Sequence, residues 1–195
     1  MPKTNLQTSI LKEKRRVLIM EKALKLFATY GVDNITIDDI ADSLKISHGL
    51  FYHYFKDKND LIDEIIKKSK DVFSILLSQL NSEDKSPKEI VRFLSEFILN
   101  ELKEDEENAY YINFFLTINF QKTYRSNDTG HLEIENLLNI IKKGQKEGEF
   151  KDNVEPWEIL TIFFTSLEGL TNGKIKYKNE YKLPSSQALL NIFLK

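Results

Sequence analysis

The feature that most constrains the fold is a pair of short helical segments between Thr36 and Phe55, joined by almost no linker. Thr36 is a good N-cap for a helix that ends near Leu44, and Ser47 can cap a second helix from His48 to Phe55. Two helices joined by so short a turn must cross closely. The segment therefore predicts a helix-turn-helix unit.

A longer helix is expected before this pair, from Lys12 to Tyr30, because its apolar residues recur at helical spacing and Gly31 is a natural stop. A close crossing of the two short helices needs a small residue, and Ala41 is placed at the contact. The side chains expected to lock the crossing are Ile37, Ile40, Leu44, Ile46, Phe51 and Phe55. The three helices make a predicted domain of residues 12–57, which follows a flexible basic arm of residues 1–11.

The last of the three helices is expected to show a polar and aromatic face to the outside. Phe51 and Phe55 are four residues apart, so both point inward. The outward residues are then His48, Gly49, Tyr52 and His53, with Leu50 and Tyr54 at the margins. In a helix-turn-helix domain this face enters the major groove of DNA.

The distribution of charge agrees with DNA contact at the N-terminal end. The whole chain carries a net charge of −2, which by itself does not suggest a nucleic-acid binder. Residues 1–30, however, hold seven Lys and Arg against two acidic residues, whereas residues 31–60 hold three against six. A basic end on an acidic body fits phosphate contact. A solvated Lys-rich terminus is the alternative.

The domain resembles the DNA-binding domain of the TetR family of transcriptional regulators. The resemblance rests on Ile19 to Phe27, Tyr30-Gly31, Thr36 to Ala41, Ile46-Ser47, Tyr52 to Phe55, and Asp57-Lys58 followed by Leu61. It implies that Thr36 and Lys58 contact phosphate from helix N-termini, and that Arg15 and Arg16 reach the DNA backbone or minor groove. It also implies a double-stranded DNA interface that contains Ser47, His48, Gly49, Leu50, Tyr52, His53 and Tyr54.

Two residues depart from the family pattern. Lys45 stands where the turn usually has Gly, and a left-handed residue other than Gly costs about 1–2 kcal/mol. Either the turn is adjusted, or Lys45 offers a further cation to phosphate. Leu50 stands where Thr or Ser is usual; it cannot donate a hydrogen bond, but it can contact a thymine methyl.

The remainder of the chain also has helical periodicity, so we expect an all-α protein of about nine helices. Residues 58–195 are expected to form an effector-binding and dimerisation domain, as the resemblance implies. The expected helices cover residues 58–80, 87–103, 106–121, 131–146, 156–170 and a final helix from Pro184 or Ser185, with a loop at 126–130 and a connector at 173–183.

The aromatic stretch from Tyr110 to Phe115 makes a wide helical stripe, for which core packing is the ordinary explanation. The resemblance favours a pocket in this domain for a largely apolar small-molecule effector. The candidate lining residues are Phe73, Leu77, Phe93, Phe97, Tyr110, Asn113, Phe114 and Thr117.

The last two helices are apolar on more than one side, which predicts burial on more than one side. They are either central core helices or, as the resemblance favours, the helices that pair with their copies in a two-fold homodimer. The candidate interface residues are Ile159, Ile162, Phe163, Ser166, Leu170, Leu189, Leu190 and Phe193.

Other classes of protein find little support. The chain has no Cys, and it shows no nucleophile elbow, phosphate loop or metal-ligand spacing, so we expect no enzyme, no cofactor and no metal site. No signal peptide or membrane-length apolar run is seen, and a cytoplasmic protein is the default expectation. The alternative to a DNA-binding regulator is a helical protein-partner module that has lost specific DNA binding.

Overall fold

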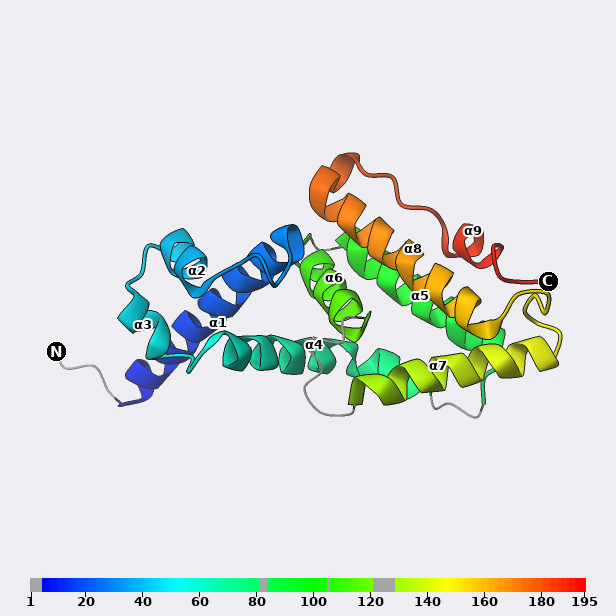
Figure 1. Ribbon diagram of the computed structural model, residues 1–195, viewed down its shortest axis with the longest axis horizontal. Helices are drawn as coiled ribbons and strands as arrows, with labels where there is room; N and C mark the ends of the chain where they lie inside the picture. Colours follow the sequence, from blue (N-terminus) through cyan, green and yellow to red (C-terminus); the bar gives the residue numbers. More distant parts are fainter. Residues whose placement is uncertain (1–4, 81–83, 105, 121–128) are drawn as a thin grey trace. The chain divides into compact units, whose positions relative to one another are not determined.

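The protein is all-α, as predicted. The computed structural model describes residues 5–80, 84–104, 106–120 and 129–195, and these residues form nine α-helices and one 3-10 turn (Figure 1). None of the described helices is both long and apolar enough to span a bilayer. In chain order the helices are α1 (Asn5–Tyr30), α2 (Ile37–Leu44), α3 (His48–Tyr52), α4 (Lys58–Leu80), α5 (Pro87–Glu104), α6 (Glu106–Phe120), α7 (Thr129–Lys146), α8 (Pro156–Tyr177) and α9 (Ser186–Leu190).

The chain divides into two compact units, residues 1–68 and 69–195. The boundary lies within α4, whereas the sequence placed it before that helix, at Asp57. Because α4 begins in the first unit, its first turns belong to the small N-terminal core. Leu61 and Ile65 of α4 are fully buried there, together with Ile19, Leu24, Ile40, Phe51 and Phe55.

The second unit is built around α8. This helix packs against α6 and α7, while α5 packs against α6, α7 and α9. Its buried apolar residues form one cluster that includes Leu102, Ile112, Leu167 and Leu190. The ordinary core explanation of the aromatic stretch in α6 therefore holds for Tyr111, Ile112 and Phe114, which are buried.

The C-terminal residues close this unit instead of continuing a helix. The sequence predicted a final helix from Pro184 or Ser185, and α9 begins at Ser186 and ends at Leu190. The chain then returns to the α7–α8 connection, where Leu194 pairs with Phe150 in an isolated antiparallel bridge, near the C-terminus drawn in Figure 1. Lys195 Nζ lies 2.7 Å from Asp152 Oδ2. Phe193 and Leu194 are buried in this conformation.

Three other boundaries differ from the sequence-based expectation. The arm expected over residues 1–11 is helical from Asn5, because no Gly or Pro interrupts this stretch. Helix α3 ends at Tyr52 and not at Phe55, since Tyr54 N–H donates to Phe51 O in a tighter turn. Helix α8 continues through Gly173 to Tyr177. Gly173 leaves space for the ring of Tyr181, because a Cβ at that position would overlap the ring.

One further expectation concerns the start of α7. The loop expected at 126–130 lies partly outside the described residues, and its last two residues belong to the first turn of α7.

Candidate nucleic-acid interface

The start of α2 is fixed by a reciprocal pair of hydrogen bonds. Asp39 N–H donates to Thr36 Oγ1 at 3.1 Å, and Thr36 N–H donates to Asp39 Oδ2 at 2.7 Å. The Thr36 hydroxyl also donates to Asp39 Oδ2 at 2.6 Å. These hydrogen bonds from Thr36 lower the pKa of Asp39. The predicted N-cap is thus confirmed, and its hydroxyl is already engaged by Asp39, so the phosphate contact of Thr36 stays a prediction.

The turn between α2 and α3 is left-handed at Lys45. This residue has φ 54° and ψ 43°, so the turn keeps the geometry that Gly usually provides. Ile46 N–H donates to Ala41 O at 3.0 Å, which closes the Schellman motif expected of a left-handed helix end. Lys45 itself is exposed, so its ammonium group is free to face a phosphate.

Helix α3 presents the outward face that the sequence predicted. Ser47 Oγ accepts a hydrogen bond from Leu50 N–H at 3.2 Å and caps the helix. Phe51 is fully buried, whereas His48, Gly49, Tyr52 and His53 are exposed. Leu50 and Tyr54 are half-buried at the margins. A Cβ added at Gly49 would meet nothing within 4 Å, so this glycine leaves open space on the outer face.

The outer face of α3 is organised by ring contacts and by one polar contact between α2 and α3. The rings of His48 and Tyr52 meet edge to face at 5.3 Å, and those of His53 and Tyr54 at 5.2 Å. His48 Nε2 lies 2.6 Å from Asp38 Oδ1 in the first turn of α2. Asp38 is not among the residues that the sequence predicted at the interface. Its contact with His48, ten positions away, depends on how the two helices cross.

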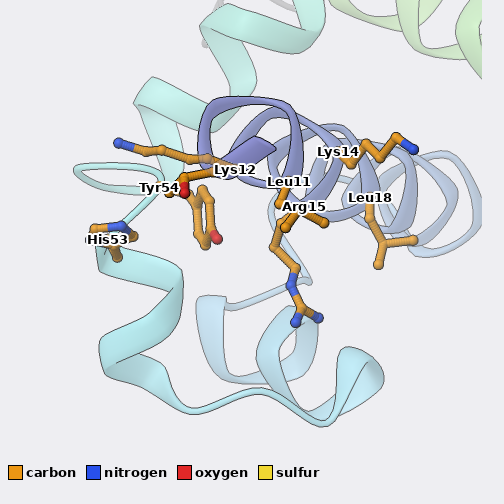
Figure 2. Close-up of a pocket in the computed structure, with 8 residues that line it drawn as sticks. Leu11, Lys12, Lys14, Arg15, Leu18, His53 and Tyr54 are labelled. Atoms are coloured by element: carbon orange, nitrogen blue, oxygen red, sulfur yellow. The ribbon is translucent and has the colours of Figure 1, made fainter. Parts of the chain in front are cut away.

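A groove of about 530 Å³ lies between α1 and the turn after α3. Leu11 and Leu18 line it together with three cations of α1, and His53 and Tyr54 lie on the other side (Figure 2). The cations are Lys12, Lys14 and Arg15, all exposed. The sequence singled out Arg15 for DNA contact, and the structure places it beside Tyr54 of the predicted interface.

Two of the predicted phosphate-binding cations have internal partners. Arg16 lies 3.0 Å from Glu64 of α4, and its guanidinium stands over the Phe55 ring at 5.2 Å. Lys58 Nζ donates to Val32 O at 2.6 Å, and burial lowers the pKa of Lys58. The structure therefore uses both cations to hold α4 to the rest of the first unit. Their partners are far away in sequence, so spacing alone could not reveal these contacts.

The predicted effector residues lie in several environments of the second unit. Phe93 and Phe97 are half-buried with their ring centroids 6.4 Å apart, and Tyr110 and Thr117 are also half-buried. Phe114 is in the core, and Asn113 Nδ2 donates to Asn172 Oδ1 at 2.8 Å. The side chains of Phe73 and Leu77 lie outside the described residues. The role of these residues in binding an effector stays a prediction.

Most of the predicted dimer residues belong to the core of the protomer. The buried ones are Ile159, Phe163, Leu189, Leu190 and Phe193. Phe163 and Phe193, for example, meet at 5.9 Å between ring centroids. The apolar sides of α8 and α9 that carry these five residues pack against other helices of the same chain, and their role in a dimer stays a prediction. Of the remaining three, Ile162 is exposed, and Ser166 and Leu170 are half-buried.

The outer side of α8 carries a different row of residues. Trp157, Thr161, Thr165 and Gly169 recur at intervals of four and are exposed, with Ile162 beside them. Trp157 is 58% exposed and Ile162 44% exposed. The sequence-based reasoning missed Trp157, although it is the single Trp of the chain and stands one residue after the helix-opening Pro156.

The two capped helices, the left-handed turn and the outward face of α3 define a helix-turn-helix DNA-binding regulator. Residues 19–65 match the model of the bacterial regulatory proteins of the tetR family, so the helix-turn-helix domain of this chain is similar to the domain of those proteins. It is 27% identical over 191 residues to IcaR, the negative transcriptional regulator of the biofilm operon icaADBC in Staphylococcus aureus strain Newman. That match covers 91% of this chain and 97% of IcaR.

Solved structures show the same fold. The ketosteroid transcriptional regulator KstR2 of Mycobacterium tuberculosis matches with a TM-score of 0.60 at 17% identity, covering 93% of this chain and 95% of KstR2. AibR, solved with isovaleryl coenzyme A and operator DNA, matches with a TM-score of 0.57 at 17% identity, covering 91% and 94%. Both matches extend through the second unit, so the family fold is not confined to the DNA-binding domain.

Proposed function

We propose that this protein is a repressor that binds a palindromic operator as a homodimer and is released from it by a small-molecule effector. The observation that carries the proposal is the turn at Lys45 with the caps at Thr36 and Ser47, which together fix the outer face of α3. A face held by the backbone in this way is ready to enter a major groove without rearrangement. Such a protein acts in the cytoplasm, where bacterial DNA lies.

The residues of the interface fall into two groups. Ser47, His48, Gly49 and Leu50 lie in the first turn of α3 or just before it, the part of a recognition helix that reaches base edges. The second group surrounds this turn and positions the DNA backbone. It consists of Lys45, Tyr52, His53 and Tyr54, with Lys12, Lys14 and Arg15 across the groove.

A homodimer would use the outer side of α8. The row from Trp157 to Gly169 combines an exposed aromatic ring with small side chains, which allow two helices to approach closely. A two-fold pair presents α3 twice, so the operator would have half-sites about one helical turn apart.

Repression and a small-molecule effector are supported by similar proteins. IcaR is a negative regulator, and AibR was solved with isovaleryl coenzyme A and operator DNA. We place the effector of this protein in the second unit, between helices of the aromatic-rich region around α6. Because binding at two sites is reciprocally coupled, an effector that weakens DNA binding must itself bind more weakly to the DNA complex.

Selection from a randomised duplex library, followed by fluorescence anisotropy with the selected duplex at fixed salt, tests DNA recognition. The selected duplex should be a palindrome that binds at least a thousandfold more tightly than random duplex. Tyr52→Ala should weaken binding, whereas Lys142→Ala, at an exposed position of α7 in the second unit, should not. Equal affinity for selected and random duplexes would favour the protein-partner module and reject the proposal.

A further inference from the structure

His48, the first residue of α3, is held from two sides. Its Nε2 lies 2.6 Å from Asp38 Oδ1 of α2, and its ring meets that of Tyr52 edge to face, with an interplanar angle of 89°. The first contact fixes which ring edge faces the protein, and the second fixes the plane of the ring. A side chain fixed in this way offers a defined atom to whatever binds α3.

We propose that Asp38 is a positioning residue for His48, and that the pair makes α3 read a hydrogen-bond donor on one base of the operator. This inference rests on the proposed function. A carboxylate can only accept hydrogen bonds, so Nε2 of His48 carries a proton and donates it to Asp38. In the neutral form of the ring, which the proposal requires, Nδ1 has no proton and is a hydrogen-bond acceptor.

An acceptor distinguishes the bases in the major groove. Cytosine presents the N4 amine and adenine presents the N6 amine, and both can donate to Nδ1. Guanine presents N7 and O6, and thymine presents O4, all of which are acceptors. The pair therefore selects cytosine or adenine at the base that His48 faces, and disfavours guanine and thymine there.

The surroundings single out Asp38 among the acidic residues of α2. Asp39 is turned back onto Thr36, and Asp42 is exposed one turn further along the helix. The side chains of His48 and Asp38 are 50% and 76% exposed, and a polar pair so open to water contributes little to folding. Loss of Asp38 should therefore leave the fold intact and change only what His48 offers to DNA.

A change in affinity alone would not establish the proposal. Removing any carboxylate near the DNA reduces repulsion from phosphate and strengthens binding to all sequences. The signature of positioning is instead a loss of discrimination at one base pair. Asp42→Ala is the matched control, because it removes the same charge from the same helix without touching His48.

The test uses the full chain and the duplex that the protein itself selects from a randomised library. Failure to select any duplex would reject the proposed function before this pair is examined. With a selected duplex, every base pair is changed in turn, and His48→Ala identifies the position that depends on His48. Wild type should prefer cytosine or adenine there by about fivefold or more. Asp38→Ala should lose this preference, Asp38→Glu should restore part of it, and Asp42→Ala should keep it.

Two further measurements separate positioning from a general structural effect. The double variant Asp38→Ala, His48→Ala should show the same preference between bases at this position as His48→Ala alone, because Asp38 acts through His48. The chain has three His residues, so the imidazole ¹⁵N signals of His48 can be assigned in the DNA complex. Wild type should show a protonated Nε2 and an unprotonated Nδ1, and Asp38→Ala should show a mixture.

The proposal is overturned by any of three results. One is a preference for guanine or thymine at the position that depends on His48. Another is the absence of any base pair at which His48→Ala reduces discrimination. The third is an Asp38→Ala variant that keeps both the base preference and the ¹⁵N signals of wild type.

Discussion

Gly144 of α7 lies directly against the ring of Phe150, so that a Cβ added at Gly144 would overlap two atoms of that ring. Phe150 is almost completely buried and pairs with Leu194 in the closure formed by the C-terminal residues. The glycine thus makes room for the side chain around which the end of the second unit is packed.

Gly144→Ala should therefore destabilise the protein, although alanine is the better helix former. The overlap forces Phe150 or the start of α5 to move, and overpacking of a core costs about 1–3 kcal/mol. Urea denaturation measures this loss. Unchanged or increased stability would show that Phe150 can move at no cost.

Gly49→Ala is a contrasting substitution in the first unit. The added methyl meets no protein atom, so stability should be retained or rise by up to about 1 kcal/mol, as expected for Gly to Ala in a helix. Operator affinity should fall, because the methyl projects from the face that approaches the bases. Urea denaturation measures the stability of the variant, and anisotropy titration of the same preparation measures its operator affinity. Retained affinity would place Gly49 outside the interface.

Lys58 should contribute to folding stability, whereas Arg15 should contribute to DNA binding. Lys58→Gln removes the hydrogen bond to Val32 O and should lower stability by about 1 kcal/mol, with little change in the salt dependence of DNA binding. Arg15→Ala should leave stability unchanged and reduce the slope of log affinity against log salt by about one. The measurements are thermal unfolding and anisotropy at four salt concentrations. A reduced slope for Lys58→Gln would restore the phosphate contact that the family resemblance implied.

Acid should weaken the start of α2 through Asp39. Hydrogen bonds from Thr36 hold the pKa of this carboxyl below its ordinary value. A depressed folded pKa stabilises the protein at pH values above the ordinary Asp value of about 3.9, and this contribution is lost as the pH falls through the folded pKa. The stability of wild type should therefore fall more steeply below about pH 4 than that of Asp39→Asn. Circular dichroism during denaturation at several pH values measures the difference, and parallel curves would contradict it.

The helix-turn-helix was predictable because its signals are local. Thr36, Ser47 and the left-handed Lys45 act on backbone groups within five residues, and the alternation of Phe51 and Phe55 with exposed residues follows from helical spacing alone. The structure confirms both caps, the turn and the outward face of α3.

The contacts that the sequence did not predict concern side chains whose partners are distant in sequence. Arg16 and Lys58 are expected to contact DNA, and within the first unit they contact Glu64 and Val32. The apolar residues of α8 and α9 indicated burial, but apolarity does not say whether the covering surface comes from the same chain or from a second copy.

The sequence by itself determined that the protein is helical, that its N-terminal domain has a helix-turn-helix, and which residues α3 turns outward. Only the tertiary structure decided which cations remain available to DNA, which face of α8 is left exposed, and that Asp38 meets His48. The physical reason is range: caps, turns and helical periodicity act over a few residues, whereas ion pairs and core contacts depend on how helices far apart in the chain are packed together.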